Sequence, residues 1–177
     1  MTPATCAPAV RGRHLSPAEL SEVVERYADD VRAGRYVPEF RTDERWHVRI
    51  HEDDDVDVWL ISWTTEQGTE LHDHGGSSGA FAVVDGILDE HVWSGRRRDG
   101  TGLLVSEARE TGDLVAFGPD YVHDVRNRLA PPALSVHAYS PPIRLMRHYD
   151  LEGTELVQTG STWTDDPETA APQRAAS

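Results

Sequence analysis

The feature that most constrains the fold is a long series of short strand-like runs that begins at Arg45. Each run is rich in β-branched or aromatic residues, or alternates apolar with polar residues, and turn residues separate the runs. The pair Asp85-Gly86 between FAVV and ILDEHVW is a strong signal for a two-residue hairpin. The runs that we expect to form strands are 45–51, 57–63, 68–73, 80–85, 87–93, 102–107, 113–117, 121–126, 133–139 and 143–149. About ten strands at this spacing predict an all-β fold, a sandwich or closed barrel of the jelly-roll class.

One helix is expected ahead of the strands. Ser16, Pro17 and Glu19 combine a capping box with proline at the first helical position, and Gly34 marks the end. The apolar residues in between recur at helical spacing and are expected to face the core: Leu20, Val23, Val24, Tyr27 and Val31. We expect this short N-terminal helical segment, 16–34, to cover one end of the barrel.

The chain is expected to form a single domain. Its 177 residues, 38% of them apolar, suffice for one well-filled core and are few for two. Residues 1–14 have few large apolar groups and are expected to be a mobile leader, and residues 161–177 a flexible tail. The predicted domain is therefore 15–160, with the barrel over about 45–160.

Charge and composition exclude several classes of function. With 31 acidic against 17 basic residues, the net charge of −14 argues against nucleic acid or an anionic membrane as a partner, because phosphate contacts would be repulsive. Every basic residue is an arginine, which excludes Schiff-base, pyridoxal phosphate and phosphate-loop lysine chemistry. The single cysteine, Cys6, excludes a disulfide framework and a Cys-X-X-Cys pair. No signal-peptide core or membrane-length apolar run is recognised, so we expect a cytoplasmic protein with a small-molecule ligand.

The stretch LHDHGGSSG contains two histidines one residue apart. Residues two apart in a strand point to the same face, so His72 and His74 can approach one metal ion together. The glycines and serines that follow are typical of a loop at which ligands bind. The pair alone leaves two interpretations open, a metal site or histidines in ordinary roles.

The spacing of these residues resembles the two sequence motifs of the cupins. The first motif is a histidine, one residue, a histidine, four residues, a glutamate, six residues and a glycine. Here His72, His74 and Gly86 keep these intervals, and Gly79 takes the glutamate position. In the second motif the first glycine, the histidine and the asparagine keep their intervals, while the proline and the inner glycine are replaced: Gly112, His123, Asn127, Gly118 and Asp120. The resemblance implies a double-stranded β-helix barrel in which His123 adds a third imidazole.

The glycine at position 79 changes the charge of such a metal site. Two histidines and a carboxylate place one negative charge on a divalent ion, whereas three neutral imidazoles leave the full charge to be met by the substrate. An anionic, chelating ligand is favoured, and a thiolate is the anionic donor best suited to borderline first-row ions. The alternative is that His123 is a surface or core histidine and Gly79 a turn residue.

Within the cupins, the chain resembles the thiol dioxygenases, in particular the cysteine dioxygenase family, over roughly residues 45–150. The shared segments are SW at 62–63, LHDH at 71–74, VHDVRN at 122–127 and LSVHAYSPP at 134–142. The resemblance implies one Fe(II) per chain, held by His72, His74 and His123, and no organic cofactor.

The segment LSVHAYSPP is the most specific part of this resemblance. It implies that Ser135 hydrogen-bonds His137 and that His137 orients Tyr139, whose hydroxyl lies near the metal. The strand period agrees, because it places all three side chains on one face. The alternative for Tyr139 is a structural one, in which it caps the barrel with its hydroxyl in water.

The resemblance also implies how a substrate is held. Arg49 occupies the position of the family's carboxylate-binding arginine, although a strand arginine is more often a solvated edge residue. His47 stands where the family has a tyrosine that contacts substrate. Relatives that act on 3-mercaptopropionate have glutamine at the Arg49 position and arginine at the Met146 position, so this combination favours L-cysteine. Gly79 replaces the cysteine that animal members link to the tyrosine, so no Cys–Tyr crosslink is expected at Tyr139.

The function implied is a monomeric enzyme that oxidises L-cysteine with O2 to cysteine sulfinate. Three alternatives stay open. One is a dioxygenase for 3-mercaptopropionate or another small thiol. Another is a zinc hydrolase or isomerase, since three imidazoles also suit zinc. The last is a non-catalytic cupin that uses the same pocket as a metal-binding sensor or binding module.

Overall fold

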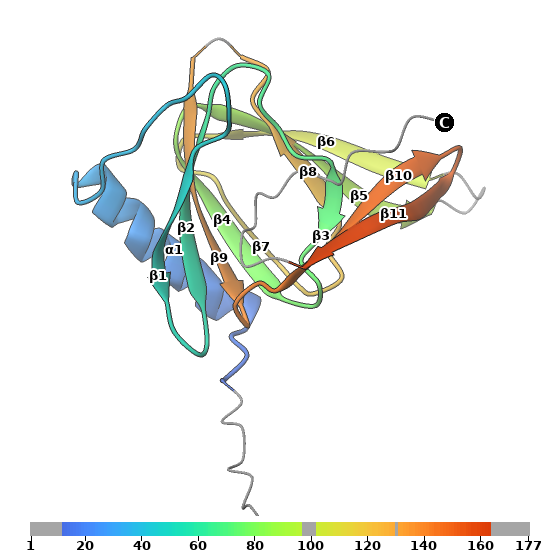
Figure 1. Cartoon of the computed structure of the whole chain (residues 1–177), viewed down its shortest axis with the longest axis horizontal. Helices are drawn as coiled ribbons and strands as arrows, with labels where there is room; N and C mark the ends of the chain where they lie inside the picture. Colours follow the sequence, from blue (N-terminus) through green and yellow to red (C-terminus); the bar gives the residue numbers. More distant parts are fainter. Residues whose placement is uncertain (1–11, 97–101, 130, 164–177) are drawn as a thin grey trace, which may run out of the picture.

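The computed structural model describes residues 12–96, 102–129 and 131–163, and these residues form one helix and eleven strands. The elements are α1 (Pro17–Arg32), β1 (His47–Glu52), β2 (Asp57–Trp63), β3 (Leu71–Asp73), β4 (Ser78–Asp85), β5 (Ile87–Arg96), β6 (Gly102–Glu110), β7 (Leu114–Phe117), β8 (His123–Arg126), β9 (Ala133–Ser140), β10 (Leu145–Glu152) and β11 (Glu155–Trp163). The strands make two antiparallel sheets, ordered β1-β2-β9-β4-β7 and β11-β10-β3-β8-β5-β6. The sheets face each other around a common interior (Figure 1). The predicted all-β barrel with an N-terminal helix is confirmed.

The start of α1 follows the predicted capping box. The Glu19 backbone N–H donates to Ser16 Oγ at 3.3 Å, and the Ser16 backbone N–H donates to Glu19 Oε2 at 2.8 Å, so two donors at the helix start are paired. The helix ends at Arg32, two residues before Gly34, whose φ of 75° lets the chain turn away.

The position predicted for the helix is wrong. Instead of covering one end of the barrel, α1 lies along the outer face of the sheet that contains β4 and β9 (Figure 1). Leu20, Val24 and Val31 are buried there in a cluster with Val58, Leu60 and other outward side chains of that sheet, and Val23 packs against it while only partly buried. Because both faces of this sheet are covered, every residue of β2 and β9 is buried. The two strands therefore form a well-packed support for the side chains on their inner face.

Strand β11 was not predicted. Its sequence, ELVQTGSTW, carries few large apolar residues, and most of its side chains are exposed or half-buried, so the alternation that marks a half-buried strand is weak. It pairs with β10 through a turn at Gly153, which has a φ of 63°. The strand continues to Trp163 and so includes residues 161–163, which the sequence analysis placed in the tail.

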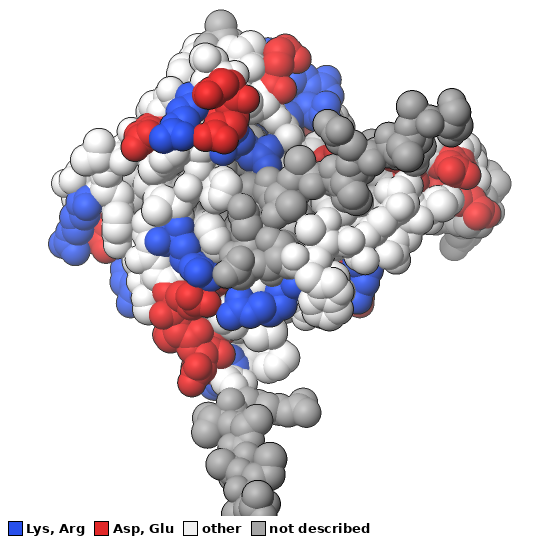
Figure 2. All heavy atoms as spheres, viewed as in Figure 1, with Lys and Arg blue, Asp and Glu red and all other residues white. Residues whose placement is uncertain are grey.

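The first residues of the predicted leader, 1–11, lie outside the described residues. The residues that follow contact the domain, since the Arg13 backbone N–H donates to Asp55 Oδ1 at 2.5 Å and the Arg13 guanidinium pairs with Glu19 at 3.1 Å. The described part of the chain contains no helix that is long and apolar enough to cross a bilayer. On the face shown in Figure 2, acidic and basic side chains lie next to one another rather than in separate patches.

Candidate metal centre

Three buried histidines meet inside the barrel. His72 lies in β3, His74 follows the end of that strand, and His123 begins β8, directly opposite His72 in the antiparallel pair. Their ring centroids are 4.9 to 5.3 Å apart, and one ligand nitrogen from each side chain lies within 4.8 Å of the others. The structure thus brings together the three residues that the motif spacing predicted as metal ligands.

The turn after His74 depends on glycine. Gly75 and Gly76 have φ angles of 64° and 104°, a region that other residues rarely adopt, and a Cβ on Gly75 would collide with the Leu145 backbone. The Ser77 N–H donates to the His74 carbonyl at 3.1 Å and closes the turn. The GGSSG sequence therefore reverses the chain directly behind a ligand, so that β4 can begin at Ser78.

The donor atoms suit a divalent metal ion. His74 Nε2 is buried and has no hydrogen-bond partner among the described residues, which is costly for a polar atom unless something else binds it. His72 Nδ1 lies 2.7 Å from the Glu70 carbonyl oxygen, so Nδ1 carries the proton and Nε2 keeps its lone pair. Burial holds the pKa of His72 and of His74 well below the ordinary value, and both rings are therefore neutral ligands.

The position of the missing carboxylate is filled by an aromatic ring. A Cβ on Gly79 would overlap the ring of Phe117 and would come within 3.0 Å of Tyr139 Cδ1. Phe117 has little room to move, because it stacks on His74 at 5.1 Å and on Tyr121 at 4.5 Å. A side chain at position 79 would require the Phe117 ring to move, and the glycine itself offers neither a carboxylate nor a thiol.

A hydrogen-bonded series leads through β9 to the metal cluster. Trp63 Nε1 donates to Ser135 Oγ at 2.8 Å, Ser135 Oγ lies 2.8 Å from His137 Nε2, and His137 Nδ1 lies 3.3 Å from the Tyr139 hydroxyl. Tyr139 in turn stacks on the ring of His74 at 4.7 Å. The predicted arrangement of Ser135, His137 and Tyr139 is present in the geometry, and Trp63 is an additional member. Tyr139 is only 2% exposed, so the alternative with its hydroxyl in water is wrong.

The directions of the last two hydrogen bonds depend on the tautomer of His137. Trp63 can only donate, so Ser135 Oγ accepts from it, and in one tautomer of His137 Ser135 gives its own proton to His137 Nε2. Burial lowers the pKa of His137 to about 3, so the ring is neutral, and with Nε2 accepting, Nδ1 carries the proton and donates to the Tyr139 oxygen. The Tyr139 hydroxyl hydrogen then points away from His137.

The predicted substrate residues on β1 lie at the inner edge of the same sheet. His47 and Arg49 pair with Ile61 and Trp59 of β2, and β2 pairs with β9. The Arg49 guanidinium lies 5.1 Å above the Trp59 ring, and the His47 ring is 5.9 Å from it. Both side chains therefore point to the face that carries His137 and Tyr139. Met146 is 1% exposed and belongs to the inner apolar cluster around these groups.

The family model described as cysteine dioxygenase type I matches residues 6–152, from before the helix to the end of β10. The chain belongs to the cysteine dioxygenase type I family. Family membership and the three-histidine cluster together support an enzyme of the dioxygenase class.

Two solved structures show the fold of this cysteine dioxygenase family member. The TT1209 protein of Thermus thermophilus is 17% identical, covers 62% of this chain and 93% of its own, and has a TM-score of 0.51. A conserved protein with a double-stranded β-helix domain from Klebsiella pneumoniae is 20% identical, covers 61% of this chain and 85% of its own, and has a TM-score of 0.50. The predicted cupin double-stranded β-helix is confirmed.

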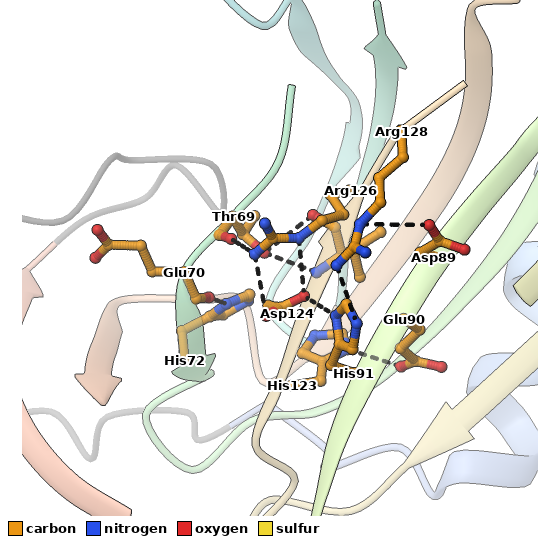
Figure 3. A network of polar contacts seen from close by, with 11 residues as sticks. Thr69, Glu70, His72, Asp89, Glu90, His91, His123, Asp124, Arg126 and Arg128 are labelled. Atoms are coloured by element: carbon orange, nitrogen blue, oxygen red, sulfur yellow. Dashed lines mark hydrogen bonds and ion pairs between the residues drawn. The ribbon is translucent and has the colours of Figure 1, made fainter. Parts of the chain in front are cut away.

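Glu90 is a residue of this cysteine dioxygenase family member that sequence reasoning missed. It is fully buried in β5, and its Oε1 lies 2.8 Å from His123 Nδ1, as Figure 3 shows. It also accepts from Arg109 Nε at 2.8 Å and from the Tyr121 hydroxyl at 2.9 Å. Burial raises the pKa of Glu90, but these hydrogen bonds outweigh burial and hold it below its ordinary value. A carboxylate therefore orients the third imidazole and supplies negative charge behind it.

Replacing Glu90 with glutamine should weaken metal binding by about 10- to 100-fold, because His123 loses the carboxylate that fixes its tautomer and raises its basicity. Competition with a chelator for the bound metal measures the change. Asp89→Asn is the matched control, since Asp89 is the neighbouring carboxylate and pairs with Arg128 at 3.5 Å. Equal metal affinity of Glu90→Gln and wild type would contradict the role of Glu90.

Asp57 is a second buried acid that sequence reasoning missed, because it stands in the acidic run EDDDVDV. It is fully buried opposite Tyr139 in the β2–β9 pair. Its Oδ2 accepts from Trp59 Nε1 at 3.0 Å and from the Ile143 backbone N–H at 3.3 Å. Asp57 thus holds the indole that lies under Arg49, together with the segment that leads into β10.

Burial raises the pKa of Asp57 from 3.8 to about 6, and this shift predicts a pH dependence of stability. The folded chain binds the proton more tightly than the unfolded chain, so the stabilisation is complete below about pH 4 and is lost as the pH rises toward 6. Relative to Asp57→Asn, the free energy of unfolding of wild type should fall by up to about 3 kcal/mol across this range. Urea unfolding at several pH values measures it, with Asp120→Asn, an exposed carboxyl, as control. A constant difference between wild type and Asp57→Asn would refute the prediction.

Proposed function

We propose that this chain is a thiol dioxygenase that oxidises L-cysteine with O2 to cysteine sulfinate at one Fe(II) held by His72, His74 and His123, with no organic cofactor. One observation carries the proposal. The three imidazoles form a buried, metal-sized cluster, and the ring of Phe117 fills the place from which a carboxylate would complete it. Three uncharged imidazole ligands would leave the double positive charge of a divalent ion to be neutralised by an anionic substrate. A thiolate is an anionic donor that suits such an ion.

The overall reaction balances without a further reductant. The thiol RSH and one O2 give the sulfinic acid RSO2H, so both oxygen atoms pass to the sulfur and the sulfur supplies all the electrons. Bound Fe(II) would supply neighbouring positions for the thiolate and for O2 and would carry electrons between them. The residues of the chain then have to bind the thiol, orient it, exclude bulk water and direct a proton.

Each predicted residue has a task in this proposal. Arg49 binds the substrate carboxylate, for which a planar guanidinium is suited, with His47 beside it over the same Trp59 ring. In the tautomer in which His137 Nδ1 donates to the Tyr139 oxygen, Tyr139 directs its hydroxyl hydrogen toward the reacting oxygen atoms. Ser135 and Trp63 hold His137 in the required tautomer. Met146 and Phe81 belong to the apolar cluster that keeps water from the inner wall.

L-Cysteine is favoured over 3-mercaptopropionate by Arg49 and Met146. Met146 is buried in the inner apolar cluster, where an arginine would lose its solvation. A cytoplasmic location and a monomeric state stay predictions from the sequence and its resemblance.

Metal analysis of protein made in iron-replete medium, followed by oxygen uptake on adding L-cysteine, tests the proposed function. We expect iron in the site and one O2 consumed for each sulfinate formed, with slower uptake on 3-mercaptopropionate and cysteamine. Zinc in place of iron would favour a hydrolase or isomerase. Saturable cysteine binding by the iron-loaded protein without sulfinate would favour the sensor or binding module, and either result would defeat the proposal.

A further inference from the structure

A single carboxylate joins two arginines at the end of β1. Glu52 Oε1 lies 3.1 Å from Arg49 Nη1 and 3.2 Å from Arg144 Nη2. Arg49 reaches Glu52 from the same strand, whereas Arg144 comes from the segment between β9 and β10. Two residues 95 positions apart in the sequence therefore present their guanidinium groups to one oxygen atom.

The side chain of Arg144 is held in place from two sides. Its Nη1 donates to the Ile143 carbonyl at 2.8 Å, and the Ile143 N–H donates to buried Asp57 at 3.3 Å. Asp57 lies opposite Glu52 in the β1–β2 pair, so the same pair of strands anchors both the backbone and the guanidinium of Arg144. An arginine that is about half exposed but fixed in this way has already lost part of the freedom that ligand binding would cost.

Arg144 also lines a cavity that reaches a proposed metal ligand. The cavity has a volume of about 530 Å³, and its lining includes His74, Ser77, Arg144 and Trp163 as well as the acidic Asp53 and Asp54. The cavity thus extends from a proposed metal ligand to Arg144, and Glu52 connects Arg144 to Arg49. A small ligand that binds in this cavity beside His74 can therefore also contact Arg144.

The N–H donors of Arg144 are only partly used. One oxygen of Glu52 pairs with both guanidinium groups, and the carboxyl of buried Asp57 also lies close enough to interact with both arginines. Arg144 carries five N–H donors, and its contacts with described residues engage one oxygen at Nη1 and one at Nη2. Donors remain on Arg144 for a second carboxylate.

We propose that Arg144 is a second carboxylate-binding residue, which together with Arg49 receives the carboxylate of the thiol substrate, while Glu52 holds the two guanidinium groups side by side. This inference rests on the proposed function and adds to it a second residue that recognises the substrate carboxylate. The arginine pair selects thiols that carry a carboxylate over thiols of the same size without that group, because a carboxylate accepts the N–H donors of Arg144 that Glu52 and the Ile143 carbonyl leave unused.

Binding of L-cysteine and of cysteamine, which differ only in the carboxylate, tests the inference. Calorimetric titrations without O2 use the metal-loaded protein, with metal content measured for each variant. In Arg144→Gln, we expect L-cysteine to bind about tenfold more weakly, the loss of one charge-assisted hydrogen bond, while cysteamine stays within about twofold. The matched control is Arg35→Gln, since Arg35 pairs with Asp30 just beyond α1, away from the barrel interior. It should change neither affinity.

The possible results separate the two proposals. Wild-type cysteine affinity in Arg144→Gln, alongside a loss in Arg49→Gln, would overturn the role of Arg144 and leave the rest of the site standing. Equal weakening of both thiols in Arg144→Gln would show that Arg144 acts on the structure of the pocket and would also overturn it. If wild type binds L-cysteine selectively but forms no sulfinate, the proposed function fails while the arginine pair stands. If wild type binds neither thiol, both proposals fall.

Discussion

His123→Ala should lose both the bound metal ion and the oxygen uptake that we propose to depend on L-cysteine. Two imidazoles remain in this variant, and a cavity replaces the third. We expect iron affinity to fall by more than about 100-fold, beyond the loss that removing an outer hydrogen-bond partner causes. Chelator competition and an oxygen electrode measure the two effects. His72→Ala should behave in the same way, since the two rings face each other across β3 and β8.

The control for this experiment is His91→Ala. His91 pairs with Asp124 at 2.7 Å in the network drawn beside the metal cluster in Figure 3, so the variant removes a histidine from β5 without removing a ligand. It should keep its iron and its activity. Thermal unfolding of both variants checks that each is folded. Iron bound to folded His123→Ala with wild-type affinity would exclude His123 from the ligand set.

Tyr139→Phe should keep the metal ion and the affinity for L-cysteine but turn over about 100-fold more slowly. A fall in turnover rate of this size is typical of the loss of a positioned proton donor. Phenylalanine retains the stacking on His74 and lacks only the hydroxyl that contacts His137. Steady-state kinetics should therefore show a lower kcat with an almost unchanged KM.

Tyr149→Phe is the matched control for Tyr139→Phe. The Tyr149 hydroxyl also donates to a neighbour, Asp73 at 2.7 Å, and this contact lies outside the Ser135–His137–Tyr139 series. Its kcat should match wild type. An unchanged kcat in Tyr139→Phe would show that the hydroxyl takes no part in turnover, and the series through β9 would then be structural.

Much of the fold could be predicted because most strands carry a local signal. The Asp85-Gly86 hairpin and the mostly apolar β2 and β4 are recognisable from short stretches of sequence. Strand β11 could not be predicted in this way, because its side chains are mostly exposed. It is stabilised by pairing with β10, and a short stretch of its own sequence does not reveal that partner. The residues of the helix were predicted correctly, but its position was predicted wrongly. An amphipathic pattern identifies the face of a helix that is buried but not the surface against which that face packs.

The residues of the candidate site also differ in whether they carry a local sequence signal. His72, His74 and His123 could be found because motif spacing is a property of the chain, and the structure brings their rings together. Glu90 and Asp57 could not, because two buried acids look like any others among 31 acidic residues until their partners are known. One weak signal existed for Glu90, since in β5 it shares a face with buried Leu88. The contact of Glu52 with Arg144 is purely tertiary and has no local sequence signal.

The ring of Phe117 over Gly79 has a consequence for how this barrel can change its chemistry. Any single exchange at position 79 meets an aromatic ring that is already stacked on His74 and Tyr121. A two-histidine, one-carboxylate centre therefore requires Phe117 to move or to be exchanged together with Gly79. Phe117 in β7 packs against Gly79 in β4, and this contact favours a centre made of three imidazoles. An apolar residue that is not itself a ligand thus limits which residues can bind the metal ion.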